Sequence, residues 1–254
     1  MLHNILFLGV GEACDSRYPN TSLLLQTTSG QGLALLDCGF TTPHLYFQRC
    51  AIADELKVLW ISHFHGDHFF GVPLLLLRFM EMGRRDPLVI IGPQGVEEKI
   101  CIALDLAYAN VRGELPYTLS FQEMEAGATV ESAGLSWTAA EAQHTDLSLA
   151  IRVADKSKSI FYSGDGKPAP EAQALAGNCD LIILEAFRVS GETPGHGSIS
   201  EAIVFAKTSG AKNLALLHIN RHDRLEHIKE MQDILDREKE THVFLPEPGD
   251  IFRL

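Results

Sequence analysis

Apolar residues along the chain fall into two kinds of segment. Short apolar runs bounded by glycine, proline or polar residues predict β-strands, at residues 4–8, 23–27, 33–37, 58–61, 88–91, 117–121, 135–140, 149–153, 159–163, 180–184, 213–217 and 242–245. Apolar residues spaced three or four positions apart predict helices, at residues 43–50, 69–82, 95–106, 170–176, 198–209 and 224–240. The helix at 198 begins with Ser198 and Glu201, the spacing of a capping box.

The order of these elements predicts the fold class. An early antiparallel hairpin at 23–37 is followed by alternating strands and helices in each half of the chain. We therefore expect an α/β protein, a four-layer αβ/βα sandwich of two mixed β-sheets flanked by helices. The strands at 117–121 and 135–140 are assigned to the second sheet. No linker interrupts the chain, so residues 1–254 are expected to form a single domain.

Composition and charge narrow the class of protein. The chain is 46% hydrophobic, enough for a large core, and its formal net charge is −12. Proteins that bind long nucleic acids need a basic surface, so such a partner is disfavoured. The five cysteines are scattered and indicate reduced thiols, not a disulfide framework. With no signal peptide and no apolar run of membrane-spanning length, we expect a cytoplasmic protein without a membrane partner.

The strand at 58–61 runs directly into a loop rich in metal-binding side chains. His63, His65, Asp67 and His68 fall within six positions, in the pattern H-x-H-x-D-H. Imidazole and carboxylate are the ligands that zinc and similar cations prefer, and alternation along the loop would divide these four side chains between two metals about 3.5–4 Å apart. The alternative, a polar surface loop that happens to contain histidines, is disfavoured because α/β sheets build their sites at strand ends.

This pattern resembles that of the metallo-β-lactamase fold superfamily, and further residues at strand ends extend the resemblance. Taken singly, His144, Asp165 and His218 are as easily buried histidines or a turn aspartate. Together they complete two metal sites, in which His63, His65 and His144 hold one ion, Asp67, His68 and His218 hold the other, and Asp165 bridges both. Asp37, at the end of the strand at 33–37, is expected to orient the metal loop through a hydrogen bond.

Segments from nearly the whole chain are similar to the tRNase Z-like branch of this superfamily. They are 7–11, 20–22, His144-Thr145 with Ser148-Leu149, Tyr162-Ser163-Gly164-Asp165, Glu185-Ala186, His196 and Leu217-His218. The resemblance implies a hydrolase with a metal-bridging hydroxide as nucleophile. Asp67 would align that nucleophile, His196 would be the general acid, and Glu185 would support His196.

The chain also departs from that branch. Leu184 and Phe187 stand where the branch has histidine and threonine, and Gly197 interrupts a histidine-serine-threonine motif. Only 20 residues separate His144 from Asp165, which leaves no room for the long arm that holds tRNA in tRNA-processing members. We therefore expect a phosphodiesterase that acts on a small molecule or short nucleotide, with no long nucleic-acid partner. A homodimer is possible, because family members often dimerise.

Several alternatives remain open at this point. The expected cofactors are two divalent metal ions, with zinc favoured over manganese or iron. The same fold accommodates a tRNA 3′-processing endonuclease, a lactonase, a thioesterase or an arylsulfatase-like enzyme, and also a non-catalytic scaffold. Arg188, Arg221 and His222 are candidate contacts to a substrate phosphate.

Overall fold

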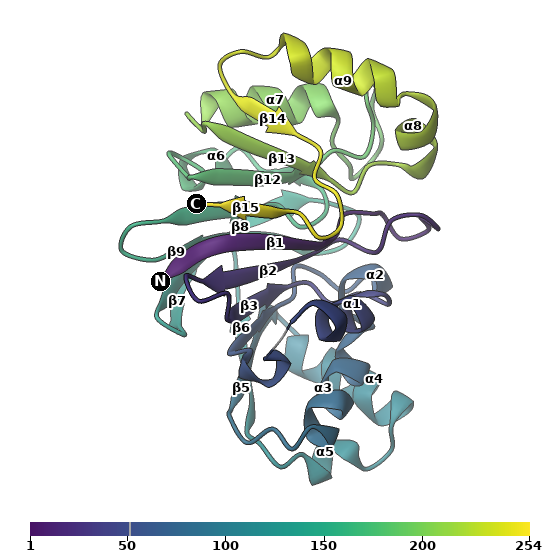
Figure 1. The fold of residues 1–254 in the computed structure, drawn as a ribbon, viewed down its shortest axis with the longest axis vertical. Helices are drawn as coiled ribbons and strands as arrows, with labels where there is room; N and C mark the ends of the chain where they lie inside the picture. The colour runs from purple at the N-terminus through teal and green to yellow at the C-terminus, as the bar shows by residue number, and fades with distance from the viewer. Residues whose placement is uncertain (51) are drawn as a thin grey trace.

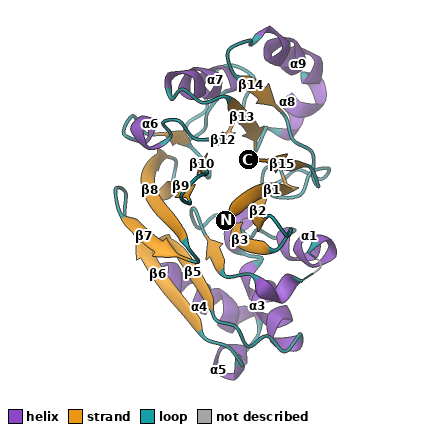
Figure 2. Cartoon of the chain, turned by 60° about the vertical axis from the view of Figure 1, so that its left-hand side comes forward, coloured by secondary structure: helices purple, strands orange, loops and turns teal. Residues whose placement is uncertain are grey.

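Two β-sheets lie face to face, with helices on both outer sides, in the computed structural model of the protein, which describes residues 1–50 and 52–254 (Figures 1 and 2). The first sheet has the strand order β15-β1-β2-β3-β4-β5-β6. Its strands are β1 (Leu2–Gly9), β2 (Ser22–Thr27), β3 (Gly32–Leu36), β4 (Val58–Trp60), β5 (Leu88–Pro93), β6 (Leu119–Met124) and β15 (Ile251–Arg253).

The second sheet has the order β11-β8-β9-β10-β12-β13-β14. Strand β7 lies outside this linear order and pairs with β8. Its strands are β7 (Thr129–Ser132), β8 (Leu135–Gln143), β9 (Ser148–Ala154), β10 (Ser159–Tyr162), β11 (Lys167–Pro168), β12 (Leu181–Glu185), β13 (Asn213–Leu217) and β14 (His242–Phe244). Both sheets mix parallel and antiparallel pairs, as predicted.

Helices from the first half of the chain cover the first sheet, and helices from the second half cover the second sheet, as Figure 1 shows. The first set is α1 (Thr42–Arg49), the 3₁₀ helix Ala53–Glu55, α2 (Gly66–Phe69), α3 (Val72–Glu81), α4 (Val96–Ala107) and α5 (Val111–Glu114). The second set is α6 (Ala172–Leu175), α7 (Ile199–Thr208), α8 (Arg221–Glu226) and α9 (Ile228–Arg237). The predicted four-layer sandwich is therefore confirmed.

Three buried hydrophobic clusters fill the spaces between the four layers. One lies between the sheets, and the other two lie between each sheet and its helices. Strand β4 contributes to two of them, because Val58 and Trp60 face the other sheet while Leu59 faces the helices. Alternate side chains point to opposite faces of a strand, and both faces here are covered, which explains the uninterrupted apolar run before the metal loop.

Three predictions about these elements are wrong in detail. The strand predicted at 117–121 belongs to the first sheet, because α4 and α5 carry the chain back so that β6 pairs in parallel with β5. The helix predicted at 69–82 begins later, as α3 at Val72, after Gly71, whose N–H donates to the Cys38 carbonyl oxygen at 2.8 Å. The helix predicted at 224–240 is divided at His227, which ends α8 and precedes α9.

Six short elements in the described part of the chain were not predicted, namely the 3₁₀ helix Ala53–Glu55, α2, α5, β7, β11 and β15. The capping box at the start of α7 is present, with both hydrogen bonds between Ser198 and Glu201. No helix in the described part of the chain is both long enough and apolar enough to cross a membrane.

Candidate metal centre

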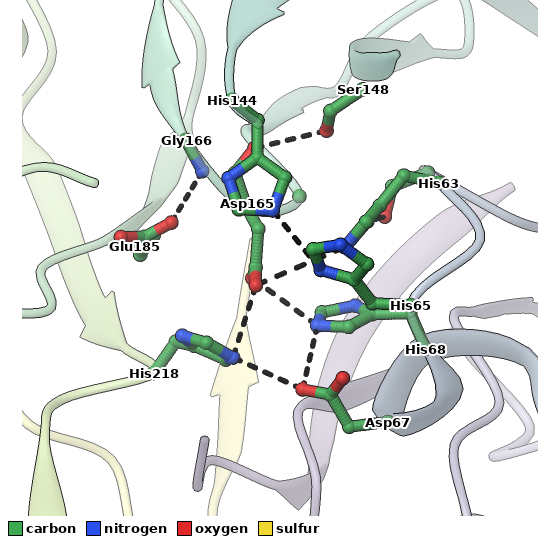
Figure 3. Close-up of polar contacts among 12 residues, drawn as sticks. His63, His65, Asp67, His68, His144, Ser148, Asp165, Gly166, Glu185 and His218 are labelled. Carbon is green, nitrogen blue, oxygen red and sulfur yellow. Dashed lines mark hydrogen bonds and ion pairs between the residues drawn. The ribbon is translucent and has the colours of Figure 1, made fainter. Parts of the chain in front are cut away.

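The candidate site lies where six strands of the two sheets end on the same edge. Strands β3 and β4 lead into Asp37 and the metal loop, and β8, β10 and β13 lead into His144, Asp165 and His218. Strand β12 ends at Glu185. Because the carboxyl ends of parallel strands meet at one edge, residues far apart in sequence converge there. All seven side chains expected to bind metal are brought together, and Figure 3 shows them arranged around Asp165.

Three of these side chains form an inner group, which consists of Asp67, His68 and His218. All three are buried, with exposed fractions of 5% or less. Asp67 Oδ2 lies 3.2 Å from His68 Nε2 and 3.3 Å from His218 Nε2. Asp165 reaches the same two nitrogens, with Oδ1 3.2 Å from His68 and Oδ2 3.1 Å from His218. Two carboxylates and two imidazoles thus converge on one point.

The other three form an outer group, which consists of His63, His65 and His144. His63 is fully buried, whereas His65 and His144 are partly exposed. His65 Nδ1 lies 3.1 Å from His144 Nε2, and His63 Nε2 lies 3.9 Å from Asp165 Oδ2. Asp165 is therefore the one residue that the inner and outer groups share among the residues described.

Buried polar atoms in this cluster fit a divalent cation. His63 Nε2, His68 Nε2 and Asp165 Oδ1 are buried without a hydrogen-bond partner of good geometry among the described residues. An unsatisfied polar atom is costly to bury, and neutral imidazole with carboxylate is a suitable donor set for divalent ions. These side chains come from distant parts of the sequence, but metal binding depends on their closeness in space. The residues present therefore fit the divalent ions that the fold implies.

Asp37 orients the metal loop through hydrogen bonds, as predicted. Its backbone lies in the left-handed region at φ 60°, and its carboxylate is completely buried. Oδ2 accepts hydrogen bonds from His68 Nδ1 at 2.8 Å, Ser62 Oγ at 2.8 Å and Tyr162 Oη at 2.7 Å, while Oδ1 accepts from the Ser62 N–H at 2.7 Å. The bond to Nδ1 leaves His68 Nε2 facing the cluster.

The loop after β10 reaches the cluster because it contains a glycine at a crowded position. Gly164 has φ +61°, and a Cβ placed there would lie 2.6 Å from Ser62 Cβ. A side chain at this position would push Asp165 away from the metal loop. The candidate ligand His218 also has a left-handed backbone, at φ 55°, and its N–H donates to the Val10 carbonyl oxygen at 2.9 Å.

Burial and charge act differently on the histidines of the two groups. Burial alone would lower the pKa of His68 and His218, but Asp165 raises both, with help from Asp37 at His68 and Asp67 at His218. The pKa of His218 reaches about 9. By contrast, burial and then the neighbouring His68 lower the pKa of His63. Without metal, the inner group therefore holds protons that a cation would displace.

Glu185 and His196 form a pair beside the inner group. His196 Nδ1 lies 2.7 Å from Glu185 Oε1, and the Gly197 N–H also donates to that oxygen at 3.3 Å. The other oxygen of Glu185 accepts a hydrogen bond from the Gly166 N–H, next to Asp165. Ligand atoms of Glu185, His196, Asp165 and His218 all lie within 4.8 Å of one another. Burial tends to lower the pKa of His196, but Glu185 raises it above its usual value.

The remaining candidates lie elsewhere or are already paired. Arg188 Nε lies 3.3 Å from Asp223, Arg221 Nη1 lies 2.6 Å from Glu12, and His222 is exposed. Sequence reasoning missed Asp146, whose Oδ2 lies 3.0 Å from His65 Nε2, because an exposed aspartate in a turn has no distinguishing pattern.

Comparison with known proteins places this arrangement in context. The family model described as Beta-lactamase superfamily domain matches residues 34–219. The ribonuclease Z of Methanosarcina acetivorans is 26% identical, over 85% of this chain and 87% of the relative. A metallo-β-lactamase fold protein from Bacillus subtilis superposes with a TM-score of 0.78 at 21% identity, covering both chains completely. Human tRNase Z, short form, has a TM-score of 0.78 at 22% identity, covering 98% of each chain.

Proposed function

Because this chain belongs to the Beta-lactamase superfamily, we propose that it is a dinuclear metal-dependent hydrolase that cleaves small or short phosphodiesters. His63, His65 and His144 would hold one divalent ion, Asp67, His68 and His218 the second, and Asp165 both. Zinc suits these nitrogen and oxygen ligands best, with manganese or iron as alternatives. When bound, such ions lower the pKa of water and polarise a phosphoryl oxygen.

The residues of the chain would divide the remaining work of the reaction. A water molecule attacks phosphorus and releases one proton to solvent, and Asp67 aligns it by accepting one of its hydrogen bonds. The bond from phosphorus to the leaving oxygen then breaks, and His196 donates a proton from Nε2 to that oxygen. The products are a phosphomonoester and an alcohol. Glu185 binds Nδ1 of the same ring, so Nε2 remains the nitrogen that can face the substrate.

The Glu185–His196 pair carries this proposal. A sugar or alkyl alkoxide is a poor leaving group and needs a proton, so an acid 2.7 Å from a buried carboxylate and close to the metal ligands suits a phosphodiester. Opening a lactone or cleaving a thioester depends less on such an acid. The name of the relative, ribonuclease Z, also favours phosphodiester chemistry.

The short segment between His144 and Asp165 favours a small substrate. Strands β9 and β10 lie between His144 and Asp165 and are joined by only four residues, 155–158. The alignment with the Methanosarcina acetivorans protein extends over 270 positions but includes only 85% of this 254-residue chain, so that relative carries residues that this chain lacks. With a net charge of −12, long RNA should bind weakly. A homodimer stays a prediction.

The His196→Ala variant tests the proposed chemistry. We expect it to retain its metals and much of its activity on bis(4-nitrophenyl) phosphate, because nitrophenolate leaves without a proton. Its kcat on a dinucleoside monophosphate, which has a ribose leaving group, should fall by roughly 10²–10⁴-fold. An equal fall on both substrates would contradict the acid role.

A substrate comparison on the metal-loaded wild-type protein tests the alternatives. We expect turnover of short phosphodiesters to exceed that of a lactone and a thioester. Cleavage of precursor tRNA at physiological salt, as efficient as cleavage of the best small substrate, would instead establish a tRNA 3′-processing endonuclease. Absence of all turnover would favour a scaffold.

A further inference from the structure

The ring of Phe187 lies against the imidazole of His196. Their centroids are 4.4 Å apart and their planes differ by 24°, a stacked geometry. Phe187 also lies near His218, with centroids 6.1 Å apart. We propose that Phe187 is a positioning residue for His196, which holds the plane of the imidazole so that Nε2 faces the leaving group. This inference rests on the proposed function.

Two different contacts restrain the His196 ring. Glu185 Oε1 lies 2.7 Å from Nδ1 of the ring, a contact that fixes one edge but leaves the ring free to tilt about that hydrogen bond. Phe187 contacts the face of the ring and opposes that tilt. A protonated imidazole is also attracted to the face of an aromatic ring. Together the two residues determine both the direction and the plane of the proton donor.

The backbone on both sides of Phe187 is fixed by hydrogen bonds. Its carbonyl oxygen accepts from the Asn220 N–H at 2.8 Å, two residues beyond His218. The next residue, Arg188, donates its N–H to the Gly197 carbonyl oxygen at 3.2 Å, one residue beyond His196. The Phe187 backbone is therefore tied to the loop of the acid and to the loop of a metal ligand. Because its backbone is held on both sides, Phe187 can keep its ring, and the His196 ring stacked on it, in a fixed position.

The Phe187 side chain does not pack in the hydrophobic core formed by the described residues. Its side chain is half-buried, and it belongs to none of the three clusters formed by the described residues. Its aromatic neighbours are the two histidines of the site. The preceding residue in the strand direction, Ala186, is fully buried and does pack in a cluster. Packing of the second sheet thus explains Ala186 but not the large ring beside it.

The test uses Phe187→Leu, which keeps an apolar side chain but removes the aromatic face, and Phe187→Tyr, which keeps the face. The measured quantity is the ratio of kcat on a dinucleoside monophosphate to kcat on bis(4-nitrophenyl) phosphate. We expect Phe187→Leu to lower this ratio about tenfold, part of the roughly 10²–10⁴-fold that a general acid contributes. Phe187→Tyr should restore it. Metal content, measured in parallel, should be the same in all three proteins.

A second readout does not depend on turnover. In protein labelled with ¹³C at histidine, the ring protons of His196 should be shifted upfield by the stacked Phe187 ring. The resonances are assigned by their loss in His196→Ala. The shift should disappear in Phe187→Leu and persist in Phe187→Tyr. Identical His196 shifts in Phe187→Leu and wild type would overturn the proposed contact.

The kinetic outcomes separate this inference from the proposed function. If His196→Ala lowers the ratio and Phe187→Leu does not, only the role of Phe187 is wrong. If His196→Ala leaves the ratio unchanged, the acid role is wrong and the role of Phe187 falls with it. If Phe187→Leu slows both substrates equally, Phe187 is structural and the inference is overturned.

Discussion

The inner and outer groups of the cluster share Asp165 but are built differently. The inner group is buried, contains a carboxylate of its own in Asp67, and is hydrogen-bonded through His68 to the fully buried Asp37. The outer group consists of imidazoles only, and its His65 is 37% exposed and paired with Asp146, which is 69% exposed. A buried carboxylate fixes its partner far more strongly than a solvated one. We therefore infer that the inner group is the rigid half of the site and the outer group the adaptable half.

Removing Asp165 should weaken metal binding by both groups at once and have the largest effect. In Asp165→Ala both sites lose a ligand, so metal content should fall well below two equivalents per chain, even after loading. Loss of the charge stabilisation supplied by the ions should lower kcat by at least about 10³-fold. Elemental analysis and turnover of bis(4-nitrophenyl) phosphate measure these effects. Two firmly bound metals in this variant would show that the groups do not depend on a shared ligand.

Removing the metals should reveal the charge of the inner group. The pKa of His218 is about 9 in the folded protein, above the usual histidine value of about 6.5, so its protonated form stabilises the metal-free fold below pH 6.5. That contribution, on the order of 3 kcal/mol, is lost as the pH rises through 9. The pKa of Asp165, lowered by His218 and His68 against the effect of burial, adds stability that is lost in acid.

Thermal unfolding of the metal-free and metal-loaded proteins across this range measures the effect. The metal-free protein should become less stable between pH 6.5 and 9, whereas the loaded protein should not, because metal binding requires deprotonated ligands. A metal-free protein whose stability did not change over this interval would show that the inner histidines are not protonated in the fold.

Asp37→Asn should weaken metal binding by the inner group more than by the outer group, because Asp37 contacts His68 directly but reaches His63 only through Ser62, whose Oγ lies 3.0 Å from His63 Nδ1. The substitution removes the negative charge of the carboxylate, which accepts hydrogen bonds from His68, Ser62 and Tyr162. Loss of such an orienting partner typically costs 10–100-fold in metal affinity, so we expect about that loss for one of the two ions. Competition with a chelator, followed by elemental analysis, measures it. Equal weakening of both ions would contradict the division into a rigid and an adaptable half.

Asp146→Asn is the matched substitution in the outer group and should have the smallest effect. Asp146 also contacts a candidate ligand through a carboxylate oxygen, which lies 3.0 Å from His65 Nε2. Because both side chains are exposed and the pair is screened by solvent, metal affinity should change by less than about threefold. The same chelator competition applies. A loss as large as that in Asp37→Asn would mean that burial does not determine how firmly these ligands are held.

Local sequence pattern was sufficient to locate much of the site. The spacing of His63, His65, Asp67 and His68 places four candidate ligands in one short loop after a buried strand, wherever the rest of the chain packs. The later candidate ligands His144, Asp165 and His218 follow apolar runs, so the rule that sites form at strand ends applied to each. The four layers could be predicted from the alternation of strands and helices. Element order and ligand spacing are both local features of the sequence, so both can be read without knowing the tertiary structure.

Only the tertiary structure decided how these residues face one another. The bond from Tyr162 to Asp37 joins residues 125 positions apart, and the partners Asp146 of His65 and Phe187 of His196 follow from the packing of separate loops. The pairing of β6 with the first sheet likewise depends on where α4 and α5 return the chain. Sequence periodicity records which face of an element is apolar, but not which other element covers that face. Side-chain contacts across the two sheets therefore arise only when both sheets have packed.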